Sequence, residues 1–84
     1  APNPYMDYGI IYVNIPQPSK ATIEITDVTG VTHIILAADV ELGAGMHEFR
    51  APTDLPSGVY MVKVQSADNV SSGRMVKSKE AIPW

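Results

Sequence analysis

The chain has 84 residues, of which 45% are hydrophobic and 18% are charged, and nine acidic against six basic side chains give a net charge of −3. This length is typical of one small domain, and the apolar content is too high for a disordered segment. Nucleic acid is not expected as a partner, because no lysine or arginine cluster can neutralise phosphates. Cysteine is absent and no apolar run approaches the roughly 18 residues of a membrane span, which excludes disulfides, thiolate chemistry and a spanning helix.

Short β-strands are predicted along most of the chain. Valine, isoleucine, threonine and tyrosine dominate, and seven prolines and six glycines interrupt them at short intervals. The predicted strands are residues 8–15, 21–28, 31–36, 46–50, 60–66 and 73–78. Residues 37–42 could extend the third strand or form a single helical turn.

Six or seven short antiparallel strands without a helix predict an all-β fold, a two-sheet sandwich of the immunoglobulin-like kind. An up-and-down barrel is less favoured, because the predicted loops differ in length. We expect one domain over residues 1–79 and a flexible tail over residues 80–84, and the start at Ala1 without a leader suggests an excised or processed product. The predicted core residues are Ile11, Val13, Ile23, Ile25, Ile35, Phe49, Tyr60, Val62, Val64 and Val76.

Residues 55–64, Leu-Pro-Ser-Gly-Val-Tyr-Met-Val-Lys-Val, give the strongest local signal. Pro56 fixes φ near −65° and Gly58 is free to adopt φ > 0, so a turn is specified before the strand. In the alternating run that follows, Tyr60, Val62 and Val64 share one face, which is typical of a strand with one buried side.

The order of five segments carries a family resemblance. The segments are Asn3-Pro4, residues 19–30, residues 45–49, residues 54–60 and residues 73–77. This succession resembles the C-terminal sorting domains of the type IX secretion system in Bacteroidetes-like bacteria, and equally the Ig-like domain of flagellar hook-capping proteins.

The resemblance implies an Ig-like β-sandwich that serves as the non-catalytic C-terminal domain of a larger secreted bacterial protein. Its partners would be that cargo protein and the outer-membrane secretion machinery, reached through the periplasm, and its location would be secreted or on the cell surface. The resemblance also assigns partner recognition to Gly58, Tyr60, Val62, Val64, Met75, Val76 and Lys77. Asp27 and Gly30 match the family's structural turn.

Candidate chemical sites are few. His33 and His47 fall in different predicted strands without a third converging ligand, so no metal site is expected. The carboxylates that could form a hydrolytic pair are Asp27, Asp39, Glu41, Glu48 and Asp54. Such a pair needs a cleft, and a thin sandwich offers little concavity. We therefore expect no enzymatic activity and no cofactor.

Three alternatives remain open. Calcium could use the loop carboxylates of Asp27, Asp39, Asp54 and Asp68, although bonds from these groups to their own turns are favoured. A carbohydrate-binding or spacer module of a glycosidase would present an exposed aromatic row. The aromatic residues available for it are Tyr5, Tyr8, Tyr12 and Trp84, with Tyr12 expected in the core. A structural module of an extracellular assembly would self-associate.

Overall fold

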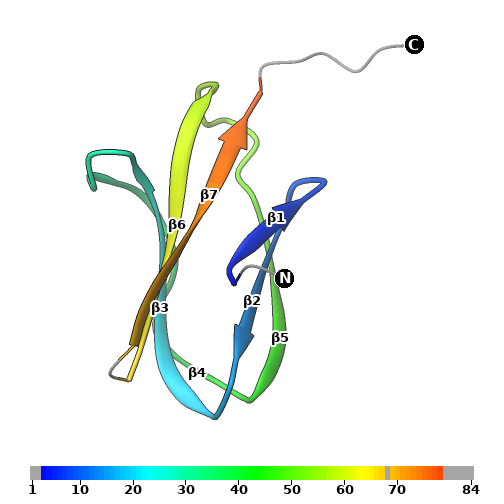
Figure 1. Cartoon of the computed structure of the whole chain (residues 1–84), viewed down its shortest axis with the longest axis vertical. Coiled ribbons are helices and arrows are strands. Elements are labelled where there is room, and N and C mark those ends of the chain that lie inside the picture. Colours follow the sequence, from blue (N-terminus) through cyan, green and yellow to red (C-terminus); the bar gives the residue numbers. More distant parts are fainter. Residues whose placement is uncertain (1–2, 68, 79–84) are drawn as a thin grey trace.

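The computed structural model describes residues 3–67 and 69–78, which form seven β-strands in two antiparallel sheets (Figure 1). The strands are β1 (Tyr5–Asp7), β2 (Ile10–Ile15), β3 (Ser19–Asp27), β4 (Thr32–Leu42), β5 (Gly45–Arg50), β6 (Gly58–Ser66) and β7 (Asn69–Lys77). The smaller sheet has the order β1-β2-β5 and the larger has β4-β3-β6-β7. The predicted β-sandwich is confirmed. Among the described residues no helix is long and apolar enough to cross a membrane, and the predicted tail over residues 80–84 lies outside them.

Each sheet contains a pair of strands that are far apart in the sequence. In the smaller sheet β2 pairs with β5, and in the larger sheet β3 pairs with β6. Both β2 and β3 therefore pair with the strand that comes three strands later in the chain. The chain must therefore cross between sheets after β2, after β4 and after β5. Immunoglobulin-like sandwiches have the same two pairings. Here β4 joins the larger sheet beside β3.

The core forms where the alternating faces of β2, β3 and β6 meet. Its fully buried side chains include Ile11, Val13 and Ile15 from β2 and Ile23 and Ile25 from β3. The β6 residues Tyr60, Val62 and Val64 complete the centre of the larger sheet. Successive strand residues point to opposite faces, so this period of two separates the core from solvent.

The prediction of core residues is wrong for Val76 and Ile35, which are largely exposed, and Phe49 is only half-buried. Val76 is 52% exposed, because it pairs opposite Val59 on the outer face and the neighbouring Met75 points inward. Ile35 is 57% exposed opposite Glu24. Irregularities in the β3–β4 register change which β4 residues point inward. Phe49 packs against the core at its margin. The remaining seven predicted core residues are buried as expected.

Several strand boundaries differ from the prediction. Of the first predicted strand, residues 8–15, only Ile10–Ile15 form a strand, β2, while Tyr8 and Gly9 form the turn that joins it to β1. Residues 37–42 continue β4 as a strand, with Asp39 at a φ of +53°, so the alternative of a helical turn is wrong. The last strand begins at Asn69, earlier than residue 73.

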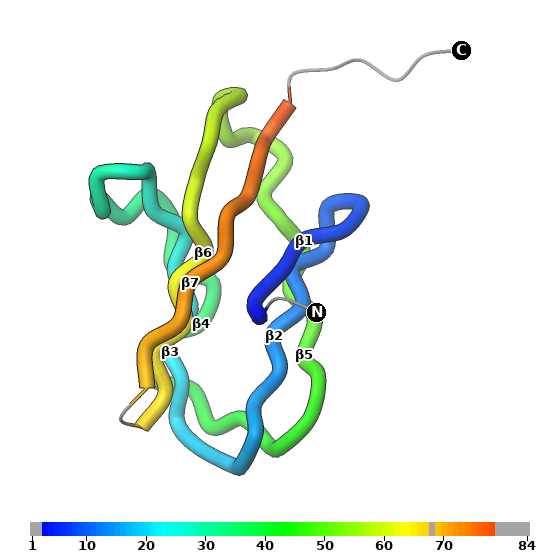
Figure 2. The backbone as a smooth tube through the Cα atoms, in the orientation of Figure 1, coloured from blue at the N-terminus to red at the C-terminus, as the bar shows by residue number. Residues whose placement is uncertain are grey.

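A close approach between the N-terminal segment and β7 ties the two layers together (Figure 2). Pro4 is fully buried, and its carbonyl oxygen occupies the space that a Cβ on Gly73 would need. Gly73 points inward from β7 between the outward residues Ser72 and Arg74. Only glycine lets the backbones meet here, because any side chain would have to displace main-chain atoms.

We predict that Gly73→Ala lowers the free energy of unfolding by about 1–3 kcal/mol, the usual cost of overpacking a filled site. The matched control is Gly43→Ala, since a Cβ at Gly43 meets nothing within 4 Å and its φ is not positive. Urea unfolding measures both variants. Equal stabilities for the two variants would contradict the close approach.

Candidate functional site

Two of the segments singled out in the sequence, the turn at Asp27 and Gly30 and residues 54–60, lie together with the end of β7 at one end of the sandwich, which we call the exit end (Figure 1). It is formed by the β1–β2 turn, the β3–β4 turn, the β5–β6 loop over residues 51–57 and the end of β7. Side chains from the strands supply hydrogen-bond partners to the backbone of the β3–β4 turn and of the β5–β6 loop, and the backbone N–H of Ala51 supplies one to the β1–β2 turn.

Tyr60 fixes the loop that enters β6. Its Oη donates a hydrogen bond of 2.6 Å to the carbonyl oxygen of Pro56, four residues upstream, and its ring is 5% exposed. Leu55 is buried beside the core in the same loop. This arrangement is the tyrosine corner of immunoglobulin-like sandwiches. The sequence predicted that Tyr60 is buried, but not this bond, for which the signal is a tyrosine soon after a proline-containing turn.

Lys77 closes the same loop from the end of β7. Its Nζ donates to the carbonyl oxygens of Thr53 at 2.9 Å, Leu55 at 3.1 Å and Pro52 at 3.3 Å. An ammonium group has three N–H donors, so each can meet one of these acceptors. The cation thus satisfies three carbonyl groups of a crossing segment that has no strand partner.

Asp27 organises the β3–β4 turn. Its Oδ1 accepts hydrogen bonds from the Thr29 hydroxyl at 2.6 Å, the Thr29 N–H at 2.8 Å and the Val31 N–H at 3.0 Å. Gly30 lies at a φ of +93° and donates its N–H to the Asp27 carbonyl. The Thr29 hydroxyl, and then the two backbone N–H groups, hold the pKa of the Asp27 carboxyl below its usual value.

His33 connects this turn to the tyrosine corner. Its Nε2 lies 3.6 Å from Asp27 Oδ2, and its ring meets the Tyr60 ring edge-on at 5.6 Å between centroids. The Asp27 turn and the Lys77-bound loop are therefore linked through the ring of Tyr60.

The residues assigned to recognition occupy three kinds of position. Tyr60, Val62, Val64 and Met75 are buried in the core. Gly58 begins β6, and the Lys77 ammonium is held by the loop carbonyls. Val76 alone among the seven presents a largely exposed side chain, and it lies opposite Val59, which is 38% exposed.

The candidate metal and acid–base residues are dispersed. His33 lies on β4 in the larger sheet, and His47 lies on β5 in the smaller sheet, with its Nε2 2.7 Å from the Gly43 carbonyl. Asp39 is 4.0 Å from the Lys20 ammonium at the surface. Within residues 3–67 and 69–78 no three histidine or carboxylate groups come together as metal ligands. The predicted ligand Asp68 lies outside the described residues.

Two of the candidate platform tyrosines stack on the outer face of the smaller sheet. Tyr5 and Tyr12 are cross-strand partners, with ring centroids 4.9 Å apart and planes at 19°. The prediction that Tyr12 belongs to the core is wrong, since its inward neighbours are Ile11 and Val13. Partial burial raises the pKa of Tyr12, and the nearby Glu48 carboxylate raises it further. Trp84 lies outside the described residues.

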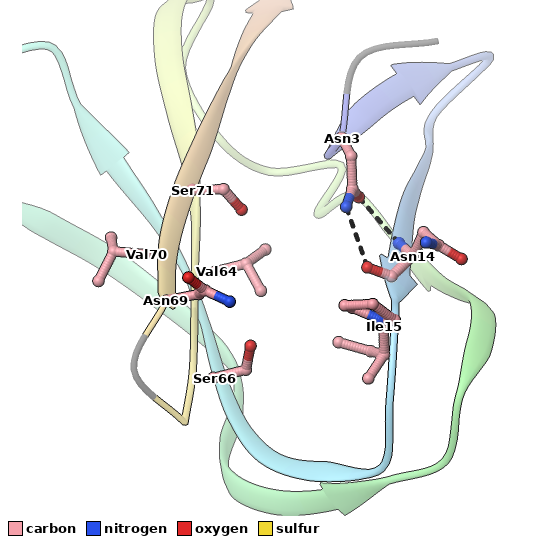
Figure 3. A pocket seen from close by; sticks show the side chains of 9 residues that line it. Asn3, Asn14, Ile15, Val64, Ser66, Asn69, Val70 and Ser71 are labelled. Atoms are coloured by element: carbon pink, nitrogen blue, oxygen red, sulfur yellow. Dashed lines mark hydrogen bonds between the residues drawn. The ribbon is translucent and has the colours of Figure 1, made fainter.

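A cavity of about 220 Å³ lies at the opposite end, between β2 and the β6–β7 hairpin (Figure 3). The Asn3 amide closes one wall by donating to the Asn14 carbonyl at 2.9 Å and accepting from the Asn14 N–H at 2.8 Å. The other wall carries Ser66, Asn69 and Ser71. None of the lining side chains is ionisable, so the cavity offers neutral polar groups and no acid or base.

The chain matches a known protein family. The model of a family described as "Secretion system C-terminal sorting domain" matches residues 1–78. No curated protein and no solved structure matches the chain. The matched segment contains all seven described strands and the bonded residues of the exit end, Asp27, His33, Tyr60 and Lys77.

We predict that Lys77→Met lowers the free energy of unfolding by about 1–3 kcal/mol, because three carbonyl groups lose a charged donor while the aliphatic stem remains. Amide hydrogen exchange should also accelerate in residues 51–57. Lys20→Met is the control and should change stability by less than about 0.5 kcal/mol, since the ion pair between Lys20 and Asp39 is long and exposed. Unchanged exchange in Lys77→Met would contradict the bracing role.

Asp27→Ala should destabilise the domain at pH 7, and the deficit should shrink as the pH falls. The folded-state pKa of Asp27 is depressed, so its stabilisation is present above the unfolded value of about 3.9 and is lost as the pH falls through the lower, folded value. Urea unfolding between neutral and acidic pH measures the difference from wild type. A deficit in Asp27→Ala that grows on acidification would refute the assignment.

Proposed function

The chain belongs to the family of secretion system C-terminal sorting domains, and on that basis we propose that it is the non-catalytic C-terminal domain of a larger secreted bacterial protein. In this role it directs the cargo from the periplasm through the outer-membrane type IX machinery and serves in its attachment at the cell surface. The family match over residues 1–78 is the observation that carries the proposal, because it spans the complete sandwich.

The structure suggests how the motif residues divide between folding and recognition. A partner that meets the folded domain cannot touch Tyr60, Val62, Val64 or Met75, because these side chains are buried. We infer that they act by shaping the exit end. Direct contact falls to exposed groups, of which Val76 lies at the end of β7.

The position of β7 also suits a recognition role. Among the described strands it pairs only with β6 and lies at the edge of the sheet, so one side of its backbone is unpaired within that sheet. Exposed strand edges offer N–H and C=O groups to an added strand. An edge alone does not specify a partner, since β4 also ends the larger sheet. The apolar pair of Val76 and Val59 distinguishes the β7 side of the exit end.

The basic test fuses the whole chain to the C-terminal end of a reporter in a host with the type IX machinery. The reporter should appear outside the cell, and deletion of residues 75–84 should retain it in the periplasm. A host lacking the machinery is the control for leakage. Equal export of the full and shortened fusions would refute a sorting function.

A sharper prediction uses two substitutions on one strand. Val76→Thr should reduce export about fivefold, as expected when an exposed contact worth about 1 kcal/mol is lost. Val70→Thr is the matched control, because Val70 is 60% exposed on the same face of β7 at its other end. Both variants keep a β-branched residue, and thermal unfolding should show that both remain folded. Equal export of the two would remove Val76 from the recognition surface.

A further inference from the structure

Among the residues that the structure describes, Tyr8 is the most exposed of the large hydrophobic side chains, at 98%. It occupies the two-residue turn between β1 and β2, with φ angles of +51° at Tyr8 and +79° at Gly9. Positive φ at both central residues defines a type I′ turn, whose first position favours asparagine, aspartate or glycine. A bulky aromatic residue in this conformation is an outlier.

The fold gains nothing visible from this ring. In the described part of the chain, Tyr8 makes no hydrogen bond and no ring contact, whereas the other tyrosines stack, bond or pack in the core. An unfavourable backbone conformation and an exposed aromatic side chain therefore coincide at one residue. Such outliers persist where the surrounding structure imposes them, and they cluster at functional sites.

The turn that carries Tyr8 is held in place. The pairing of Asp7 with Ile10 closes the hairpin, and the carbonyl of Gly9 accepts a hydrogen bond of 2.8 Å from the N–H of Ala51. Ala51 begins the loop that Lys77 and Tyr60 brace. The exposed ring is thus carried by a fixed turn, and this turn lies at the exit end, where β7 also finishes (Figure 1).

We propose that Tyr8 is an anchor residue that inserts into an apolar pocket of a protein component of the secretion machinery, an inference that rests on the proposed function. Tyrosine is enriched among residues that dominate binding energy, and an aromatic side chain buries 150–250 Å² on insertion. A single ring on a convex turn fits a concave protein pocket. Small-molecule sites, by contrast, are themselves concave, and a sugar ligand would need such a surface on this chain.

The test measures export of the reporter fusion with Tyr8→Asn and Tyr8→Phe. Asparagine suits the turn, so Tyr8→Asn should keep the thermal midpoint or raise it by about 4 °C while export falls about tenfold. Tyr8→Phe keeps the ring and should be exported nearly as well as wild type. Purified wild-type and Tyr8→Asn chains should also pellet equally with insoluble cell-surface polysaccharide.

Each other outcome contradicts the anchor. Wild-type export of Tyr8→Asn overturns it and leaves the proposed function standing. Loss of export in Tyr8→Phe rules out an apolar pocket, because phenylalanine keeps the ring and lacks only the hydroxyl group. A loss of export with a lowered midpoint in Tyr8→Asn, repeated in Tyr8→Gly, assigns the residue to folding, and a selective loss of polysaccharide binding assigns it to sugar recognition. If the wild-type fusion is not exported, the proposed function falls and the anchor falls with it.

Discussion

The structure of the exit end depends on the hydrogen bonds that the backbone carbonyl groups of the β5–β6 loop accept from side chains. Residues 51–57 cross from one sheet to the other, so their carbonyl groups cannot pair in either sheet. Buried or half-buried backbone groups need partners. The hydroxyl of Tyr60 and the ammonium of Lys77 provide them at four carbonyl groups. This bracing fixes the start of β6 relative to the end of β7 and leaves the loop with little freedom.

The same bracing reaches the other segments of this end. The loop begins at Ala51, which holds the Tyr8 turn through the Gly9 carbonyl. On the other side, the ring of Tyr60 meets His33, which lies beside Asp27 in the β3–β4 turn. An 84-residue sandwich has a thin core and a modest stability margin. Side-chain bonds to the loop backbone therefore add to the packing of the core in holding this end.

This arrangement gives the residues of the exit end two different structural positions. Buried and bonded groups such as Tyr60 and Lys77 build a fixed end. Exposed groups such as Val76 and Tyr8 are carried by that end and remain available for contact. Substitution of a motif residue can thus abolish sorting through misfolding. Stability must be measured beside export before any residue is assigned to recognition.

Alternation and turn chemistry predicted the larger part of the fold. The β-sandwich, most strands and the buried faces of β2, β3 and β6 follow from period-two patterns that depend only on neighbours in the chain. The errors occur where pairing decides the register. Val76 and Met75 are both apolar, and the pairing of β7 with β6 determines which of them points inward. Ile35 faces solvent because of irregular pairing between β3 and β4.

The sequence by itself determined the residue types of the exit end, including the turn at Asp27 and Gly30 and the entry to β6 at Tyr60. Only the tertiary structure decided their partners. Lys77 meets carbonyl groups 22 to 25 residues earlier in the chain, and Gly73 meets Pro4 across the two layers. Local sequence patterns do not encode such contacts. The contacts arise only when the connections of the chain bring the two sheets together.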